Sequence, residues 1–88
     1  MNVTQLKNST LKVYVRSKKQ TIFEGNAKSI SSQNDGGFFD ILPMHTNYVT
    51  LVKNFVLVDK GLSSEKHIKL DSGIITVVAD TVKVFVGI

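Results

Sequence analysis

The segment "TLKVYVRS" (residues 10–17) alternates apolar and polar side chains one by one, and this alternation decides the fold class. Odd-numbered residues from 11 to 15 are leucine or valine, whereas even-numbered residues from 12 to 16 are lysine, tyrosine and arginine. Successive side chains of a β-strand point to opposite faces, so the segment predicts a half-buried strand.

Further segments show the same period of two, or a short apolar run between turn residues. They are "TIFEG" (21–25), "NAKSISS" (26–32), "FFDIL" (38–42), "TNYVTLV" (46–52), "FVLVD" (55–59), "KHIKL" (66–70), "GIITVVA" (73–79) and "TVKVFV" (81–86). The sequence therefore predicts an all-β fold, a single flattened β-sandwich or barrel of about nine to ten short, mostly antiparallel strands.

Turn residues separate these segments. "NDGG" (34–37) and "KGLSSE" (60–65) predict turns, and "PMHT" (43–46) predicts at most one helical turn. With 88 residues the chain has room for one modest core. We expect a polar N-terminal segment over residues 1–9, the sandwich domain over residues 10–88, and no second domain.

Composition limits the classes of function. The chain has no cysteine, which excludes a disulfide framework and a thiolate metal site. The net charge of +4 comes from 11 basic and 7 acidic residues. The short basic cluster of Arg16, Lys18 and Lys19 is either a phosphate-binding patch or, as we expect, a solvated hairpin tip. No secretory signal or apolar span of about 20 residues is present, so we expect a soluble cytoplasmic protein.

Residues that could carry catalysis do not form a known pattern. His45 and His67 have no metal-binding spacing, and no serine lies in a nucleophile elbow. Asp35 and Asp40 flank a turn and have no reason to converge. We therefore expect no catalytic residue, no metal, no cofactor and no nucleotide site.

Residues 23–52, followed by a glycine-containing turn at 71–75 and a final hairpin, resemble the N-terminal β-sandwich of the epsilon subunit of rotary F-type ATP synthases. The resemblance spans about residues 11–82 and rests on a Phe-x-Gly strand end and a later Gly…Ile-Leu-Pro-x-His pattern. The matching residues are Phe23, Gly25, Gly37, Ile41, Leu42, Pro43, His45 and Thr50.

The sequence departs from the family pattern at several positions. Asp40 and Met44 stand where glycine is usual, Thr46-Asn47 replaces Ala-Pro, and Ser72-Gly73 replaces Gly-Gly. The final strand reads "VKVFVGI" (82–88). Most family members continue into a C-terminal two-helix hairpin; the sequence given ends at Ile88, so we expect the regulatory function of that hairpin to be absent.

The resemblance implies a non-catalytic rotor subunit of the central stalk, which links the gamma subunit to the c-ring in proton- or sodium-driven ATP synthesis. It implies a peripheral location on the cytoplasmic face of the inner or plasma membrane, with membrane contact only through the complex. The c-ring-facing residues carried over are Gly37, Phe38, Asp40, Leu42, Pro43, Met44 and His45. The gamma-facing residues carried over are Ser17 and Thr50.

Two details of the implied interface can be stated as hypotheses. Phe38 occupies a position that is often acidic in the family, and Asp40 shares its strand face, so Asp40 could supply the missing acid. Alternation also predicts that Phe39 and Ile41 are buried while Phe38 is exposed as an interface residue. For His45, a turn-capping role and a polar contact to gamma or the c-ring both stay open.

Two other classes of function compete with the rotor subunit. One is a free-standing β-sandwich that binds a protein or carbohydrate, which an aromatic platform would favour. The chain has no tryptophan and only two tyrosines, Tyr14 and Tyr48. The other is a basic nucleic-acid-binding barrel with interleaved lysines and aromatics, for which only "KVYVR" (12–16) offers a match. We expect no nucleic-acid partner.

Overall fold

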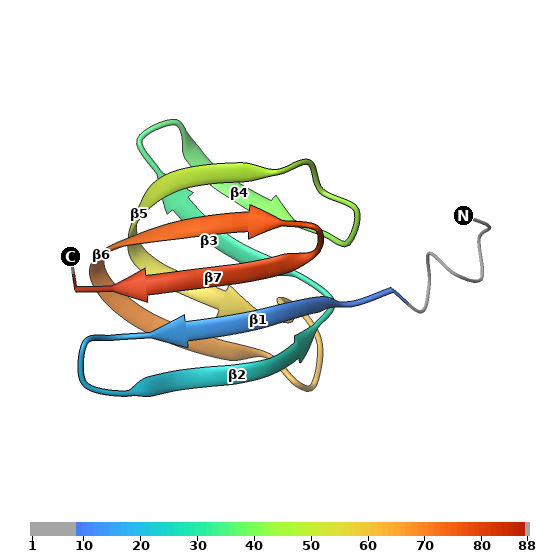
Figure 1. The fold of residues 1–88 in the computed structure, drawn as a ribbon, viewed down its shortest axis with the longest axis horizontal. Helices are drawn as coiled ribbons and strands as arrows, with labels where there is room; N and C mark the ends of the chain where they lie inside the picture. The colour runs from blue at the N-terminus through green and yellow to red at the C-terminus, as the bar shows by residue number, and fades with distance from the viewer. Residues whose placement is uncertain (1–8, 88) are drawn as a thin grey trace.

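The computed structural model describes residues 9–87, and these form seven β-strands without a helix (Figure 1). The strands are β1 (Leu11–Arg16), β2 (Thr21–Ala27), β3 (Ile30–Asn34), β4 (Gly37–Ile41), β5 (Tyr48–Val58), β6 (Lys66–Val78) and β7 (Thr81–Val86). The predicted all-β class is confirmed. The predicted N-terminal segment, residues 1–9, lies outside the described residues except for Ser9.

All seven strands belong to one sheet, in the order β2-β1-β7-β6-β5-β3-β4. Neighbouring strands are antiparallel except β1 and β7, which pair in parallel. The first half of β5 pairs with the second half of β6, which also pairs with β7, whereas the second half of β5 pairs with β3. The two long strands thus pass from one layer to the other, and the sheet folds over itself (Figure 1).

The predicted number of strands is too high because each long strand was divided in two. Asn54 does not end a strand: it adopts a left-handed conformation with φ 73° and continues β5 through a bulge. Asp71 likewise lies inside β6, where it is the extra residue opposite the step from Lys53 to Asn54. A bulge bends a strand and increases its twist, which is how one strand can serve both layers.

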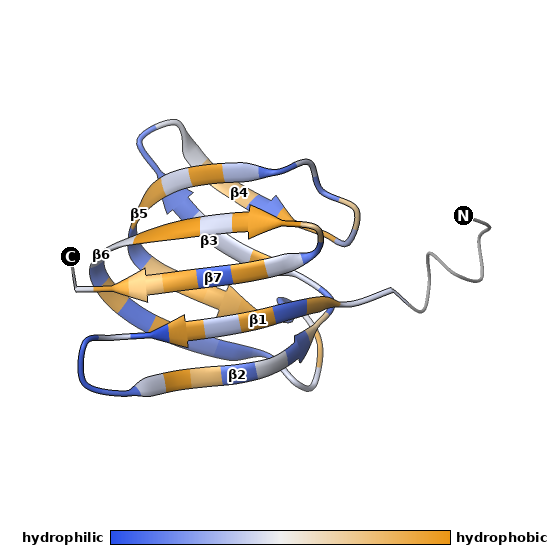
Figure 2. Cartoon of the chain, in the orientation of Figure 1, coloured by the Kyte–Doolittle hydropathy of each residue, from blue (hydrophilic) through white to orange (hydrophobic). Residues whose placement is uncertain are grey.

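The core lies between the two layers and consists of aliphatic side chains. β1 shows the predicted alternation, with Leu11, Val13 and Val15 completely buried and Lys12 and Arg16 exposed. Figure 2 shows the same banding on β7. Burying one such aliphatic side chain contributes roughly 1.5–3 kcal/mol to the free energy of folding. The other buried apolar residues are Ala27, Ile30, Ile41, Val52, Val56, Val58, Ile68, Leu70, Ile75, Val77, Val82 and Val84.

One glycine is required by close packing of the backbone. A Cβ atom on Gly73, just after the β6 bulge, would lie 2.6 Å from the carbonyl oxygen of Phe85. Gly73 pairs with Val86 on β7 and Val52 on β5, so it sits where three strands meet. The glycine that the sequence keeps in its Ser72-Gly73 pair is therefore the one that the fold needs.

Candidate protein-docking faces

The outer side of one layer, which we call the front face, carries the outward side chains of β5, β6, β7 and β1. It consists of Val49, Leu51, Ile74, Thr76, Val78, Thr81, Lys83, Phe85, Lys12, Tyr14 and Arg16. Strand register places Leu51, Ile74 and Phe85 side by side in one row across three strands. Leu51 is 68% exposed and Phe85 is 43% exposed.

Val49 and Val78 extend this row, with exposures of 64% and 58%. Large aliphatic and aromatic side chains grouped on one sheet surface are typical of a surface that another protein covers. The sequence carried a signal for this face that the strand predictions did not use. In residues 73–79 and 81–86, both faces of the strand carry apolar side chains, as expected for strands covered on both sides.

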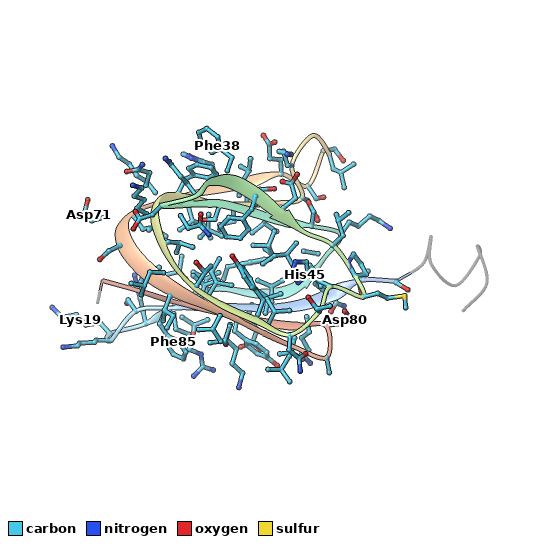
Figure 3. All side chains as sticks on the ribbon, turned by 90° about the horizontal axis from the view of Figure 1, so that it is seen from above. Lys19, Phe38, His45, Asp71, Asp80 and Phe85 are labelled. Atoms are coloured by element: carbon cyan, nitrogen blue, oxygen red, sulfur yellow. The ribbon has the colours of Figure 1, made fainter. Side chains whose placement is uncertain are left out.

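The outer side of the other layer, which we call the back face, carries three rings in contact. The ring centroids of Phe38 and Phe55 are 5.9 Å apart, and those of Phe55 and His67 are 6.0 Å apart. Phe38 is 77% exposed, as predicted, and Figure 3 shows it pointing away from the molecule on the side opposite to Phe85. Phe39 packs against the core and Ile41 is completely buried, which confirms the predicted alternation in β4.

Asp40 lies on the back face but its carboxylate already has partners. The Lys60 ammonium group lies 2.8 Å from its Oδ1, and the Ser31 hydroxyl donates a hydrogen bond to the same oxygen. These two hydrogen bonds, that of Lys60 first, hold the pKa of the Asp40 carboxyl below its usual value. The charge that the sequence offered as a replacement acid is thus compensated within the chain.

The turn after β4 is built from Leu42 to His45. The amide of His45 donates to the carbonyl of Leu42 at 3.1 Å, and Met44 adopts a left-handed φ of 70°. A proline second and a left-handed residue third are the signature of a type II turn. The single turn predicted at Pro43 is present, in a form that favours glycine where this chain has methionine.

Two contacts fix this turn. The amide of Met44 donates to Oδ1 of Asp80 at 2.7 Å, which ties the turn to the β6–β7 hairpin. The Nδ1 atom of His45 lies 2.7 Å from the carbonyl oxygen of Thr46. A carbonyl can only accept, so Nδ1 carries the proton and, when the ring is neutral, Nε2 is its acceptor. The His45 ring also contacts that of Tyr48, with centroids 5.5 Å apart.

The residues predicted to face the c-ring therefore fall into two groups. Phe38 and Asp40 lie on the back face of β4, and residues 42–45 form the turn at the end of that strand. Gly37, with φ 119°, begins β4 after the hairpin turn. Figure 3 shows Phe38 and His45 well apart, with His45 and Asp80 at the same end of the molecule.

The two residues predicted to face gamma do not lie together, and both hydroxyls are used within the chain. The Ser17 hydroxyl accepts from the amides of Lys19 and Gln20, each at 3.3 Å, and so caps the β1–β2 turn. Thr50 is half-buried, and its hydroxyl accepts from the amide of Asn34 at 3.2 Å. Its role as a contact stays a prediction; the exposed side chains of that strand belong to the residues on either side of it.

Residues 9–87 contain no group of three or more His, Asp or Glu side chains placed to hold a metal ion. In the same part of the chain, no helix is long and apolar enough to cross a membrane. The exposed surfaces, rather than a chemical centre, are therefore the features of this structure to interpret.

Comparison with known proteins agrees with this emphasis on surfaces. Residues 10–87 match the family described as "ATP synthase, Delta/Epsilon chain, beta-sandwich domain". Two similar solved structures are chains of the Euglena gracilis mitochondrial ATP synthase, in a structure of its OSCP, F1 and c-ring parts, and of the Tetrahymena thermophila mitochondrial ATP synthase, in a structure of its central stalk and c-ring.

The similarity to these two chains concerns the fold. The Euglena chain is 12% identical with a TM-score of 0.78, and the match covers 88% of this chain and 50% of that one. The Tetrahymena chain is 14% identical with a TM-score of 0.70, and the match covers 89% and 63%. This chain thus spans half to somewhat under two thirds of each. By the match over residues 10–87, the chain belongs to the β-sandwich family of ATP synthase delta and epsilon chains.

Proposed function

We propose that this chain is a non-catalytic subunit of the central stalk of an F-type ATP synthase, and that its front face binds the gamma subunit. The observation that carries the proposal is the row of Leu51, Ile74 and Phe85, which crosses three strands and is exposed. A rotor subunit must be held rigidly to the shaft, and a broad apolar sheet surface can bury enough area for a stable contact.

The second contact in this proposal is with the polar loops of the c-ring, made by the β4 back face and the turn of residues 42–45. Phe38 is the most exposed large apolar side chain of the described residues and suits a contact position. Because the Asp40 carboxylate is paired with Lys60, Asp40 contributes to this contact through the pair rather than as a free acid. Membership of the family and the likeness to chains of two ATP synthase structures support this assignment.

In this function the subunit transmits torque and does no chemistry. The test is co-purification of the chain with gamma and with the c-ring from the same organism. The proposal predicts a complex with gamma that survives gel filtration at micromolar concentration. A chain that stays monomeric in the presence of folded gamma contradicts it.

A further inference from the structure

A groove on the front face separates the apolar row from the edge of the sheet. It has a volume of about 410 Å³ and is lined by Tyr14, Arg16, Thr81, Lys83, Val84 and Phe85. It lies between β1 and β7, the one parallel pair among the described strands. Arg16 pairs in register with Phe85, so the groove begins where the apolar row ends.

Three cations surround the ring of Tyr14 in this groove. The Lys12 ammonium and the Arg16 guanidinium each lie 5.9 Å from the ring centroid. Lys83 is the register partner of Tyr14 on β7. A cation near an aromatic ring has its long side chain held by that contact, so its charged end is presented in a restricted volume.

None of these three cations is neutralised by a carboxylate within residues 9–87. The ion pairs formed there are Lys53–Asp35 and Lys60–Asp40, on other parts of the molecule. The front face holds one nearby acid, Glu24 on β2, which pairs in register with Tyr14 on the side of β1 away from the groove. The groove therefore carries a net positive charge directly beside an apolar surface.

We propose that this groove receives a carboxylate-bearing segment of the partner that covers the front face. Resting on the proposed function, the inference is that gamma presents an apolar surface flanked by Asp or Glu side chains to Arg16 and Lys83. Covering the cations with an uncharged surface would remove them from water without compensation, which is costly. An acidic segment compensates them and also fixes the orientation in which gamma docks.

The experiment measures the affinity of the full chain for gamma at several salt concentrations. The double variant Arg16→Glu/Lys83→Glu should lose at least about tenfold in affinity at low salt, and its affinity should depend less on salt or in the opposite sense. The control is Lys19→Glu/Lys69→Glu, which makes the same change in net charge outside the groove and should stay within about twofold of wild type. Arg16→Lys/Lys83→Arg keeps the charges and should bind nearly as well as wild type.

Thermal unfolding of each variant separates loss of binding from loss of folding. Wild-type binding to gamma that is unchanged in affinity and salt dependence by the charge reversal overturns this inference and leaves the proposed function standing. Equal weakening by the groove variant and its control overturns it too, because that result means attraction by overall charge. Absence of any binding by the wild-type chain overturns the proposed function and this inference with it.

Discussion

The amide of Met44 donates a hydrogen bond to the carboxylate of Asp80 at 2.7 Å, and this contact joins two turns that are distant in the sequence. Asp80 itself has a left-handed φ of 62°, in the two-residue hairpin between β6 and β7. One side chain therefore fixes the position of the turn that carries Met44 and His45.

Replacing Asp80 should loosen this turn. Asp80→Ala removes the acceptor and places alanine at a left-handed φ, so we expect the free energy of unfolding to fall by about 1–2 kcal/mol. Asp80→Asn keeps an oxygen acceptor and a residue that tolerates this φ, and should lose less than half as much. Urea denaturation of both variants measures the difference. Equal losses would show that the carboxylate contact is not what holds the turn.

Met44 occupies a conformation that glycine adopts more easily, with φ 70°. The strain of a left-handed residue, roughly 1–2 kcal/mol, exceeds the roughly 0.5–1 kcal/mol entropic cost of glycine. Met44→Gly should therefore raise the free energy of unfolding by about 0.5–1 kcal/mol. Leu42→Gly, at the first position of the same turn, is the matched control and should lower stability. A destabilised Met44→Gly variant would contradict this interpretation of the turn.

Gly73 and Gly25 provide a matched pair for testing the packing of the bend. A Cβ on Gly73 would lie 2.6 Å from a backbone oxygen, whereas on Gly25 the nearest atom is Cζ of Phe23 at 3.5 Å. Because backbone cannot move aside as a side chain can, Gly73→Ala should lower the free energy of unfolding by about 2 kcal/mol or more. Gly25→Ala should be close to neutral. Thermal unfolding midpoints of the two variants compare them directly, and similar midpoints would contradict the close approach.

The pH dependence of stability should include a contribution from Asp40. Its pKa is lowered in the folded chain by the hydrogen bonds from Lys60 and Ser31. A lowered folded-state pKa means that the ionised group stabilises the fold above its unfolded pKa of about 3.9, and that this stabilisation disappears as the pH falls through the lower folded value. The difference in unfolding free energy between wild type and Asp40→Asn should thus be largest near neutral pH and shrink in acid.

A titration by nuclear magnetic resonance checks the cause. Lys60→Met removes the first-named hydrogen bond, so the pKa of the Asp40 carboxyl should rise toward its usual value. An unchanged pKa in that variant would assign the shift to Ser31 instead. A wild-type advantage over Asp40→Asn that is the same in acid as at neutral pH would contradict the linkage altogether.

The sequence predicted the parts of this fold that depend on alternation alone. The buried face of β1 and the inward Phe39 and Ile41 of β4 follow from the period of two. The long strands could not be predicted, because Asn54 and Asp71 have the composition of turn residues, and only pairing with a neighbouring strand turns them into bulges.

The candidate surfaces show the same division. Exposure of Phe38 follows from alternation, but the pairing of Asp40 with Lys60 brings together residues from different loops and needs the fold. The apolar row is the clearest omission, since its members come from β5, β6 and β7 and only the register aligns them. The conserved-looking turn at Pro43 drew attention to one end of the molecule, whereas the largest exposed apolar surface lies on the front face.

The central claim is that the front face binds gamma, and one comparison tests it most directly. Leu51→Asp places a charge in the centre of the apolar row, and Phe38→Asp makes the corresponding change on the back face. Both side chains are exposed, so neither variant should unfold. We expect Leu51→Asp to weaken gamma binding by about 30-fold or more, as at the centre of an interface, and Phe38→Asp to leave it within about threefold of wild type. Full gamma binding by Leu51→Asp, with or without loss in Phe38→Asp, would contradict the account.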